Sequence, residues 1–345
     1  MEQLTYQNIL KYVTQEQIFE ELIFEGREIV DNNRVYTNPL RDDRNPTCHF
    51  YTTDNGRLLF MDRAAKELSG SCFDMIKVKY RVTFYEACRI IARHFKLPLD
   101  SGYLEGYEPD LTRNKIKSYY VIPALNRNEK KETEIKIVIK DYSIRDLNWW
   151  KRYGITKSIL KRYRVYPIEA CWIRKDNNSF LYHVYTYGDP MYAYIVNKHN
   201  KPPKIKIYRP LASSKNKWRT NCNVEDLQGY TQLPKKGNSL IITSSLKDVM
   251  SLKSLGYIAV APNNEGSIIP DYLIEDLNNR FENIFILYDN DEAGIKTSVK
   301  MSELINATNI ILPSNLPKDP SDIIKNNKTD ELLCILDSYG VKKYI

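Results

Sequence analysis

The stretch Ile284-Phe285-Ile286-Leu287-Tyr288-Asp289-Asn290-Asp291-Glu292-Ala293-Gly294 places two aspartates two residues apart, directly after a run of apolar residues. Consecutive apolar residues of this kind predict a strand that is buried on both faces, as in a parallel sheet. Side chains two apart at a strand end lie on the same side, so Asp289 and Asp291 are expected to project together. Crowded carboxylates repel one another unless a cation lies between them, and these oxygen ligands suit Mg²⁺ or Mn²⁺. A solvated turn that caps the following helix is the other interpretation that the stretch allows.

The sequence around this stretch alternates between strand and helix patterns from residue 238 onward. The strands are expected at Leu240–Thr243, Ile258–Ala261, Ile284–Leu287 and Asn309–Leu312, and the helices at Leu246–Leu255, Tyr272–Asn279 and Ile295–Ile305. This alternation predicts an α/β fold, a parallel sheet with helices on both faces. Ligands of such sheets bind at the carboxyl ends of the strands, and Asp289 follows one of these ends.

The positive charge of the chain is concentrated in its middle third. The 345 residues carry a net charge of +8, but residues 101–236 contain 27 Lys and Arg against 13 Asp and Glu. Residues 201–219 hold seven basic residues and no acidic one, with Tyr208 and Trp218 among them. Such a stripe is typical of a surface for phosphate backbone and stacked bases, although a solubilising face has the same composition. The alternation of lysine and isoleucine over residues 204–207 predicts a strand with one basic face, which favours nucleic acid.

Several classes of protein are excluded by composition. The six cysteines show no CxxC pair and are interpreted as reduced thiols of a cytoplasmic protein. No run of 18 apolar residues and no signal peptide is present, so neither a membrane partner nor secretion is expected. No GxxxxGK[ST] sequence occurs, so a helicase motor is not expected within this chain.

The chain is expected to contain four regions. They are a small α+β domain (1–100), a polar linker (101–134), a mixed α+β basic subdomain (135–236) and the α/β domain (237–345). In the first, strands are predicted around Cys48–Tyr51 and Leu58–Met61, and helices over Phe73–Tyr80 and from Phe84 to Phe95. In the basic subdomain, residues 147–163 predict two short helices around Gly154.

The last hundred residues resemble a Toprim domain, the fold shared by bacterial-type DNA primases, topoisomerases and some nucleases. Three blocks carry the resemblance in the expected order: residues 241–248 (IITSSLKD), residues 289–294 (DNDEAG), and residues 312–313 with 318–322 (LP and KDPSD). The DxDxAG form followed by Lys-Asp-Pro is similar to the primase-like branch of this family.

The regions before the Toprim-like part also resemble primases. Residues 38–47 (NPLRDDRNPT), 70–74 (GSCFD) and 84–87 (FYEA) are similar to blocks of the zinc-binding, CHC2-type domain of DnaG-type and phage primases. The basic block around Tyr208 and Trp218 resembles the template-holding region of phage primases. The resemblance therefore implies a phage-like primase in a host cytoplasm.

The zinc site of that family is degenerate in this chain. Asn38 and Arg41 stand where the family has zinc-binding Cys and His, and no later CxxC follows. Cys48, Cys72 and Cys88, with His49, lack the usual tetrahedral spacing, so zinc is not expected. A hydrophobic core could replace the metal, built from Phe50, Leu59, Phe60, Phe73 and Ile76.

The catalytic glutamate of the Toprim family is also missing from its usual place. The resemblance implies a general acid/base Glu after the first strand, where this chain has Ser244. Glu265 follows the second strand, whose end opens on the same edge as Ser244 and Asp289, so it is a candidate substitute. An exposed loop glutamate is the other interpretation of this residue.

The function that the resemblance implies is synthesis of short RNA primers on single-stranded DNA, by Mg²⁺- or Mn²⁺-dependent nucleotidyl transfer. The expected catalytic residues are Glu265, Asp289 and Asp291, and the expected metal ligands are Asp248, Asp289, Asp291 and Asp319. The residues expected to bind phosphates of template or nucleotide are Lys204, Lys206, Arg209, Lys217 and Arg219. The expected partners are single-stranded DNA, ribonucleoside triphosphates and a separate replicative helicase.

Two other functions remain open at this level. Because the usual glutamate is absent, the chain could be a catalytically impaired, primase-like protein that binds single-stranded DNA in a replisome. A Toprim nuclease or topoisomerase fits the sequence less well, because no single tyrosine among the 26 stands out as a nucleophile.

Overall fold

The computed structural model describes residues 2–29, 34–100, 120–121, 133–174, 181–184, 189–196, 204–264 and 266–344. The chain divides into two compact units, each considered by itself below. The first unit comprises residues 1–121, 136–139 and 169–188, and the second comprises residues 122–135, 140–168 and 189–345. Most of the predicted linker at 101–134 lies outside the described residues. None of the helices in the described ranges is long and apolar enough to span a membrane.

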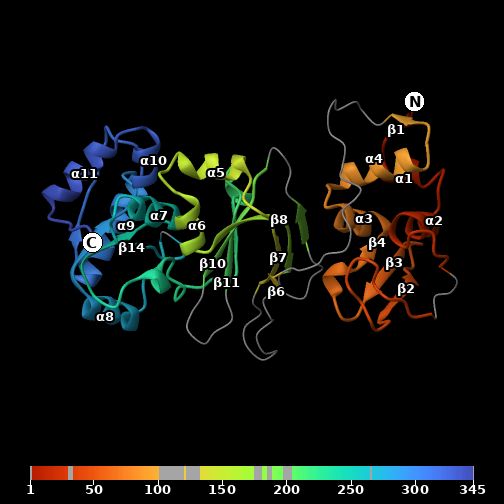
Figure 1. The fold of residues 1–345 in the computed structure, drawn as a ribbon, viewed down its shortest axis with the longest axis horizontal. Coiled ribbons are helices and arrows are strands. Elements are labelled where there is room, and N and C mark those ends of the chain that lie inside the picture. Colours follow the sequence, from red (N-terminus) through yellow and green to blue (C-terminus); the bar gives the residue numbers. More distant parts are fainter. Residues whose placement is uncertain are drawn as a thin grey trace. The chain divides into compact units, whose positions relative to one another are not determined.

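The first unit contains a small antiparallel sheet and several short helices (Figure 1). Strands β2 (Cys48–Thr52) and β3 (Leu58–Asp62) form the predicted hairpin, and β4 (Gly70–Ser71) pairs with β3. The helices are α1 (Tyr6–Ile9), α2 (Gln15–Ile18), the π-helix η1 (Phe19–Ile23), the 3₁₀ helix η2 (Lys66–Leu68), α3 (Cys72–Tyr80) and α4 (Phe84–His94). Further pairs join β1 (Glu2–Gln3) to β5 (Leu99–Asp100), β6 (Tyr120–Val121) to β7 (Glu134–Ile139), and the end of β8 (Val165–Arg174) to β9 (Leu181–Val184).

An aromatic core holds the first unit together. Phe50 and Phe60 face each other across the hairpin with ring centroids 5.1 Å apart, and Phe19 packs edge-on against Phe50. Phe73 and Ile76 of α3 are also buried. Most of the apolar residues expected to form this core are therefore in it, and they supply burial that does not depend on a metal.

The second unit begins with two helices and an antiparallel sheet. Helices α5 (Ile144–Lys151) and α6 (Lys157–Arg162) lie on either side of Gly154, whose positive φ of 74° ends the first of them. The sheet contains the start of β8 (Val165–Arg174), β10 (Tyr192–Val196), β11 (Lys204–Tyr208) and β12 (Trp218–Thr220). The 3₁₀ helices η3 (Ser214–Asn216) and η4 (Tyr230–Gln232) lie in the connections.

The predicted parallel sheet follows, with the order β14-β13-β15-β16. Its strands are β13 (Gly237–Thr243), β14 (Ala259–Val260), β15 (Phe281–Leu287) and β16 (Thr308–Asn309), all paired in parallel. Its helices are α7 (Leu246–Ser254), α8 (Asp271–Arg280), α9 (Glu292–Ile305), α10 (Pro320–Lys325) and α11 (Thr329–Ser338). Every strand and helix expected from residue 238 onward is present, with ends shifted by a few residues.

Helices cover both faces of this sheet because its central strands are apolar on both sides. Alternate residues of β13 and β15 (Leu240, Ile242, Ile284 and Ile286) share a core with α8 and α9. The residues between them (Ile241, Phe285 and Leu287) share a core with α7, α10 and α11. The α/β prediction is confirmed, and the loops after β13 and β15 open at one edge.

Candidate active site

Three carboxylates meet at the carboxyl edge of the parallel sheet. Asp248 lies in the first turn of α7, Asp289 follows β15, and Asp319 is the N-cap of α10. Each offers an oxygen, and these oxygens all lie within 4.8 Å of one another. All three residues are buried, with exposed fractions of 0% for Asp248 and 8% for each of the others. Residues far apart in the chain thus form one concentrated negative site.

Local hydrogen bonds fix the orientation of each carboxylate. The main-chain amides of Ser321 and Asp322 donate to Asp248 and Asp319 over 3.2 and 2.7 Å, respectively. The hydroxyl of Ser321 donates to Asp319 over 2.6 Å. These donors come from the start of α10, where free N–H groups favour negative charge. The short Asp-Pro-Ser-Asp sequence therefore positions two of the three carboxylates.

Ser244 points into the same group of carboxylates. Its hydroxyl lies 2.6 Å from an oxygen of Asp289 and 3.3 Å from an oxygen of Asp248. The resemblance implies a glutamate at this position, and the serine supplies a hydrogen-bond donor in place of that acid. The cluster keeps its geometry, but Ser244 has no group that could take a proton at neutral pH.

Two lysines partly balance the negative charge. Lys247 Nζ lies 3.6 Å from both Asp319 and Asp322, and Lys318 Nζ lies 2.9 Å from Asp289 and 2.6 Å from Asp291. Neither lysine was among the residues selected from the sequence. The sequence feature that could have indicated them is that each lysine directly precedes an aspartate of a Toprim-like motif.

The electrostatics of the cluster favour a further cation. Burial, followed by the charge of Asp319, raises the pKa of Asp248 well above the usual range. Burial also acts to raise the pKa of Asp319, but Lys247 and the hydroxyl of Ser321 outweigh it and lower that pKa. A hard divalent cation prefers buried oxygen ligands held this close, so these three carboxylates fit such an ion.

Asp291 lies beside the cluster rather than within it. Its carboxylate caps α9 by accepting a 2.8 Å hydrogen bond from the main-chain N–H of Gly294, as the helix-cap interpretation expected. Its other oxygen binds Lys318, the same ammonium that contacts Asp289. The two aspartates therefore converge on one cation as expected, but the cation is a lysine side chain.

A cavity of about 480 Å³ connects the carboxylates with residues of β11 and the start of β12. Lys206 and Lys217 line it together with Tyr208 and Trp218, and the three carboxylates line it as well. Lys206 is buried, with its ammonium donating to the main-chain oxygen of Asn263 and lying 4.6 Å from the centre of the Trp218 ring. Burial lowers the pKa of Lys206 to about 8. The cavity can hold an anionic ligand against the carboxylate cluster only if cations lie between them.

The basic face predicted for β11 is not on open surface at Lys206, because the cavity and Trp218 enclose this side chain. Lys204, Arg209 and Arg219, which were also expected to bind phosphate, are not among the residues lining this cavity. Arg209 forms a two-pronged ion pair with Asp189 instead. The guanidinium of Arg219 donates to the main-chain oxygens of residues 215 and 218, over 2.7 and 2.8 Å.

The two aromatic residues of the basic block stack on each other. The rings of Tyr208 and Trp218 have centroids 4.5 Å apart and planes inclined by 20°. Tyr208 is buried, and Trp218 is partly exposed at the cavity. The rings cover each other on one face, and the ammonium of Lys206 also lies over the Trp218 ring, so partial exposure alone makes Trp218 the more accessible of the two.

Glu265, the expected substitute for the missing glutamate, lies outside the described residues. Its neighbours Asn263 and Asn264 line the cavity beside the carboxylates. The loop after β14 therefore reaches the edge of the sheet at which this residue was predicted to act.

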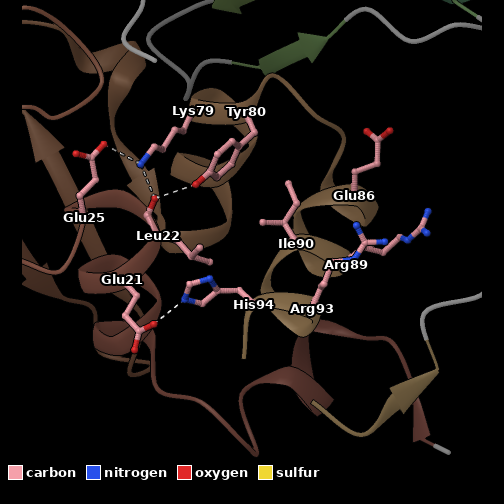
Figure 2. Close-up of a pocket in the computed structure, with 10 residues that line it drawn as sticks. All are labelled: Glu21, Leu22, Glu25, Lys79, Tyr80, Glu86, Arg89, Ile90, Arg93 and His94. Carbon is pink, nitrogen blue, oxygen red and sulfur yellow. Dashed lines mark hydrogen bonds and ion pairs between the residues drawn. The ribbon is translucent and has the colours of Figure 1, made fainter. Parts of the chain in front are cut away.

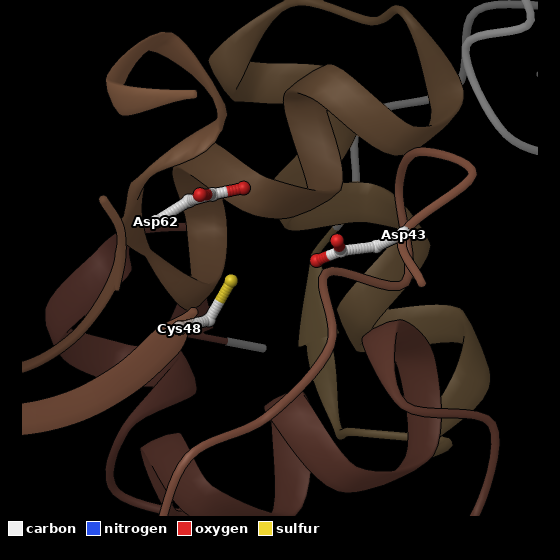
Figure 3. Close-up of side chains that lie close together, drawn as sticks. All are labelled: Asp43, Cys48 and Asp62. Atoms are coloured by element: carbon white, nitrogen blue, oxygen red, sulfur yellow. The ribbon is translucent and has the colours of Figure 1, made fainter. Parts of the chain in front are cut away.

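In the first unit, a network of polar side chains lies around Asn38 and Arg41, the positions at which the family has zinc ligands. Oxygens of Asp43 and Asp62 and the sulfur of Cys48 lie within 4.8 Å of one another (Figure 3). The guanidinium of Arg41 lies 2.8 Å from Asp43 and 2.9 Å from Asp62, and the amide of Asn38 donates to Asp62 over 2.9 Å. Burial, followed by the charge of Asp62, raises the pKa of the Cys48 thiol to about 12. The guanidinium of Arg41 and the amide of Asn38 offer no zinc ligand at the positions where the family has Cys and His, so this network does not fit its zinc site.

The first unit also has a cavity of about 360 Å³ between η1 and the helices α3 and α4 (Figure 2). Several of its polar groups are already paired: His94 with Glu21 over 2.6 Å, and Lys79 with the main-chain oxygen of Leu22 over 2.8 Å. None of the residues predicted to act in catalysis or metal binding lines it. The chemistry expected from the sequence therefore concentrates in the cavity of the second unit.

Comparisons with known proteins agree with the Toprim prediction. Residues 241–324 match the Toprim-like family model, which confirms that prediction for this stretch. No curated protein sequence matches the chain.

The structure is similar to those of several primases. The primase fragment of the bacteriophage T7 primase-helicase protein is 14% identical, with a TM-score of 0.40 over 58% of this chain and 80% of that one. The zinc-binding and RNA polymerase domains of the Aquifex aeolicus primase are 16% identical, with a TM-score of 0.43 over 96% and 85% of the two chains. A DNA primase domain from Pseudomonas aeruginosa is 15% identical, with a TM-score of 0.45 over 57% and 73%.

Proposed function

We propose that this chain is a DNA primase, which synthesises short RNA primers on single-stranded DNA. The observation that carries the proposal is the cavity of the second unit, where the carboxylates of a Toprim-like sheet edge line the same space as the lysines and aromatic rings of residues 206–218. Nucleotidyl transfer needs both halves of this arrangement, because a metal-bound triphosphate must meet a primer end held on a template. The expected domain limits at residues 100, 134 and 236 are part of this proposal.

Asp248, Asp289 and Asp319 are the residues proposed to hold Mg²⁺ or Mn²⁺, with Asp291 as a further ligand at the rim. When bound, the metal supplies Lewis-acid activation of the primer hydroxyl and neutralises the charge of the triphosphate. The carboxylates fix where the ion lies, and burial strengthens their hold on it.

The basic residues of the cavity are proposed to bind the substrates. Lys206 and Lys217 would contact phosphates, and the partly exposed ring of Trp218 at the cavity would contact a base. In the reaction, the primer 3′ oxygen bonds to the α-phosphorus of a ribonucleoside triphosphate, and pyrophosphate leaves. Glu265 is proposed to accept the proton of that hydroxyl, because Ser244 cannot.

Primer synthesis on single-stranded DNA with labelled ribonucleotides and Mg²⁺ tests the proposal. An Asp289→Asn/Asp319→Asn variant is expected to lose at least about a hundredfold in rate, because two of the three clustered ligands of the ion are neutralised. Asp330→Asn is a matched control, since this aspartate is exposed in the first turn of α11. Primer synthesis at the wild-type rate by the double variant would contradict the assignment.

A single-stranded DNA-binding replisome protein without catalysis is the second candidate, and the presence of Ser244 at the position of the expected glutamate favours it. If this candidate is right, the chain binds labelled single-stranded DNA, which fluorescence anisotropy would detect. It would then synthesise no primer on any template. Primer synthesis by the wild-type chain would eliminate it. A separate replicative helicase is a proposed partner of either form.

A further inference from the structure

Lys318 occupies the point at which Asp289 and Asp291 converge. Its main-chain oxygen accepts a 2.9 Å hydrogen bond from the N–H of Asn290, the residue between the two aspartates. The side-chain amide of Asn290 binds the main-chain oxygens of residues 313 and 316, over 3.1 Å each. The two loops are thus joined through their main chains, and the Lys318 side chain is directed toward the aspartates. Its side chain is 49% exposed, so it has room to move.

The two oxygens of Asp289 have different partners. One accepts from Ser244 within the three-carboxylate cluster, and the other contacts the ammonium of Lys318. Asp291 contacts the same ammonium and is not part of the cluster. Lys318 therefore separates Asp291 from the other carboxylates while it neutralises part of their charge.

We propose that Lys318 is the resident cation of this site, which holds Asp289 and Asp291 together until a divalent cation binds and then moves to the phosphates of the nucleotide. The inference rests on the proposed function, because it assumes a metal and a polyphosphate in this cavity. An ammonium and a divalent cation cannot share the same carboxylate oxygens, since both are positive and compete for the same lone pairs. Lys318 lines the cavity with Lys206 and Lys217, so a released ammonium remains within reach of a bound phosphate.

Lys247 provides an internal contrast. Its ammonium lies farther from its carboxylates, at 3.6 Å from both Asp319 and Asp322, and 4.8 Å from the centre of the Tyr153 ring. Its side chain is only 17% exposed, so it is enclosed by its neighbours. Lys247 is expected to stay in place when metal binds, whereas Lys318 is expected to move.

Direct measurement of Mn²⁺ binding is the first test, with free Mn²⁺ followed by electron paramagnetic resonance on the full chain. Lys318→Met is expected to bind Mn²⁺ about tenfold more tightly than the wild type, because the competing charge is removed. Lys300→Met removes one charge from an exposed position eight residues into α9, and is expected to leave the affinity unchanged. Equal affinities of the Lys318 and Lys300 variants would overturn the inference.

Lysine acylation of the wild-type protein, quantified by mass spectrometry, tests the movement itself and needs no variant. Labelling of Lys318 is expected to rise several-fold in saturating Mn²⁺ and to fall again when α,β-methylene ATP is added, with Lys247 unchanged. Unchanged labelling of Lys318 in the Mn²⁺-bound protein would overturn the inference while leaving the proposed function intact. Absence of Mn²⁺ binding, or binding that Asp289→Asn does not weaken, would overturn both.

Discussion

Replacing Asp62 by asparagine should unfold the first unit far more readily than an exposed substitution of the same kind. The Asp62 side chain is fully buried and accepts hydrogen bonds from Arg41 and Asn38 over 2.9 Å each. The main-chain amides of Ala64 and Ala65 add two more, over 2.8 and 3.0 Å. Removing the charge leaves the partly buried guanidinium of Arg41 with fewer partners, so the loss should exceed that of an ordinary hydrogen bond.

The magnitude follows from the ionisation of Asp62. Burial acts to raise its pKa, but the hydrogen bonds from Arg41, Asn38, Ala65 and Ala64 outweigh it and lower the pKa from 3.8 to about 2. That lowering corresponds to about 2.5 kcal/mol of folding free energy at neutral pH. With the cost of a broken buried ion pair included, Asp62→Asn should lose about 3 kcal/mol, or about 10 °C in the unfolding midpoint.

The effect should also depend on pH in a defined direction. Because the folded state holds this carboxyl at a lower pKa than the unfolded chain, its contribution is fully present above pH about 4 and is lost as the pH falls through about 2. Wild type and Asp62→Asn should therefore converge in stability over this interval.

Thermal unfolding, with hydrogen–deuterium exchange of peptides from β2 and β3, measures the loss in this unit. Asp54→Asn is the matched control, because Asp54 is exposed in the turn between the same strands. An unfolding midpoint for Asp62→Asn within about 2 °C of this control would refute the reasoning, since the ion pair of Asp62 would then contribute far less than about 3 kcal/mol to the stability of the unit.

Three further predictions concern the metal-binding and substrate residues. Gly294→Ala places a Cβ against the main-chain carbonyl of Asp289, so the affinity for Mn²⁺ should fall about tenfold or more, whereas Gly266→Ala, in open space, should leave it unchanged. Lys206→Met should raise the unfolding midpoint at pH 7, because burial lowers the pKa of this lysine to about 8 and so penalises its charged form. This gain in stability should shrink as the pH rises from about 8 to 10.5, where the folded wild type has already lost the charge. The same variant should bind single-stranded DNA more weakly. EDTA should leave unfolding of the first unit unchanged, because Arg41 is the cation of its polar network, and a drop in the midpoint would show a structural metal there.

Much of the fold could be predicted because local pattern and burial agree in this chain. The apolar runs of the parallel sheet are short, bounded by turns and alternate with amphipathic helices, so few other arrangements bury them. The same order of elements places the ends of β13 and β15 at one edge, which is why Asp248 and Asp289 could be expected near each other. Asp319 follows from its place in the Toprim-like motif, which sets it at the start of α10.

Partner choice among charged side chains could not be predicted in the same way. Long lysine and arginine side chains reach several carboxylates, and only the folded backbone decides which lies within contact distance. Arg209 therefore pairs with Asp189 rather than facing the cavity, and Lys206 is buried rather than displayed.

The sequence by itself determined the α/β sheet, the edge at which the aspartates lie and the absence of the usual glutamate at Ser244. Only the tertiary structure decided which cations accompany the acids: Lys318 between Asp289 and Asp291, and Arg41 between Asp43 and Asp62 in the first unit. The physical reason is that apolar periodicity is a local property of the chain, whereas an ion pair depends on where two distant segments meet.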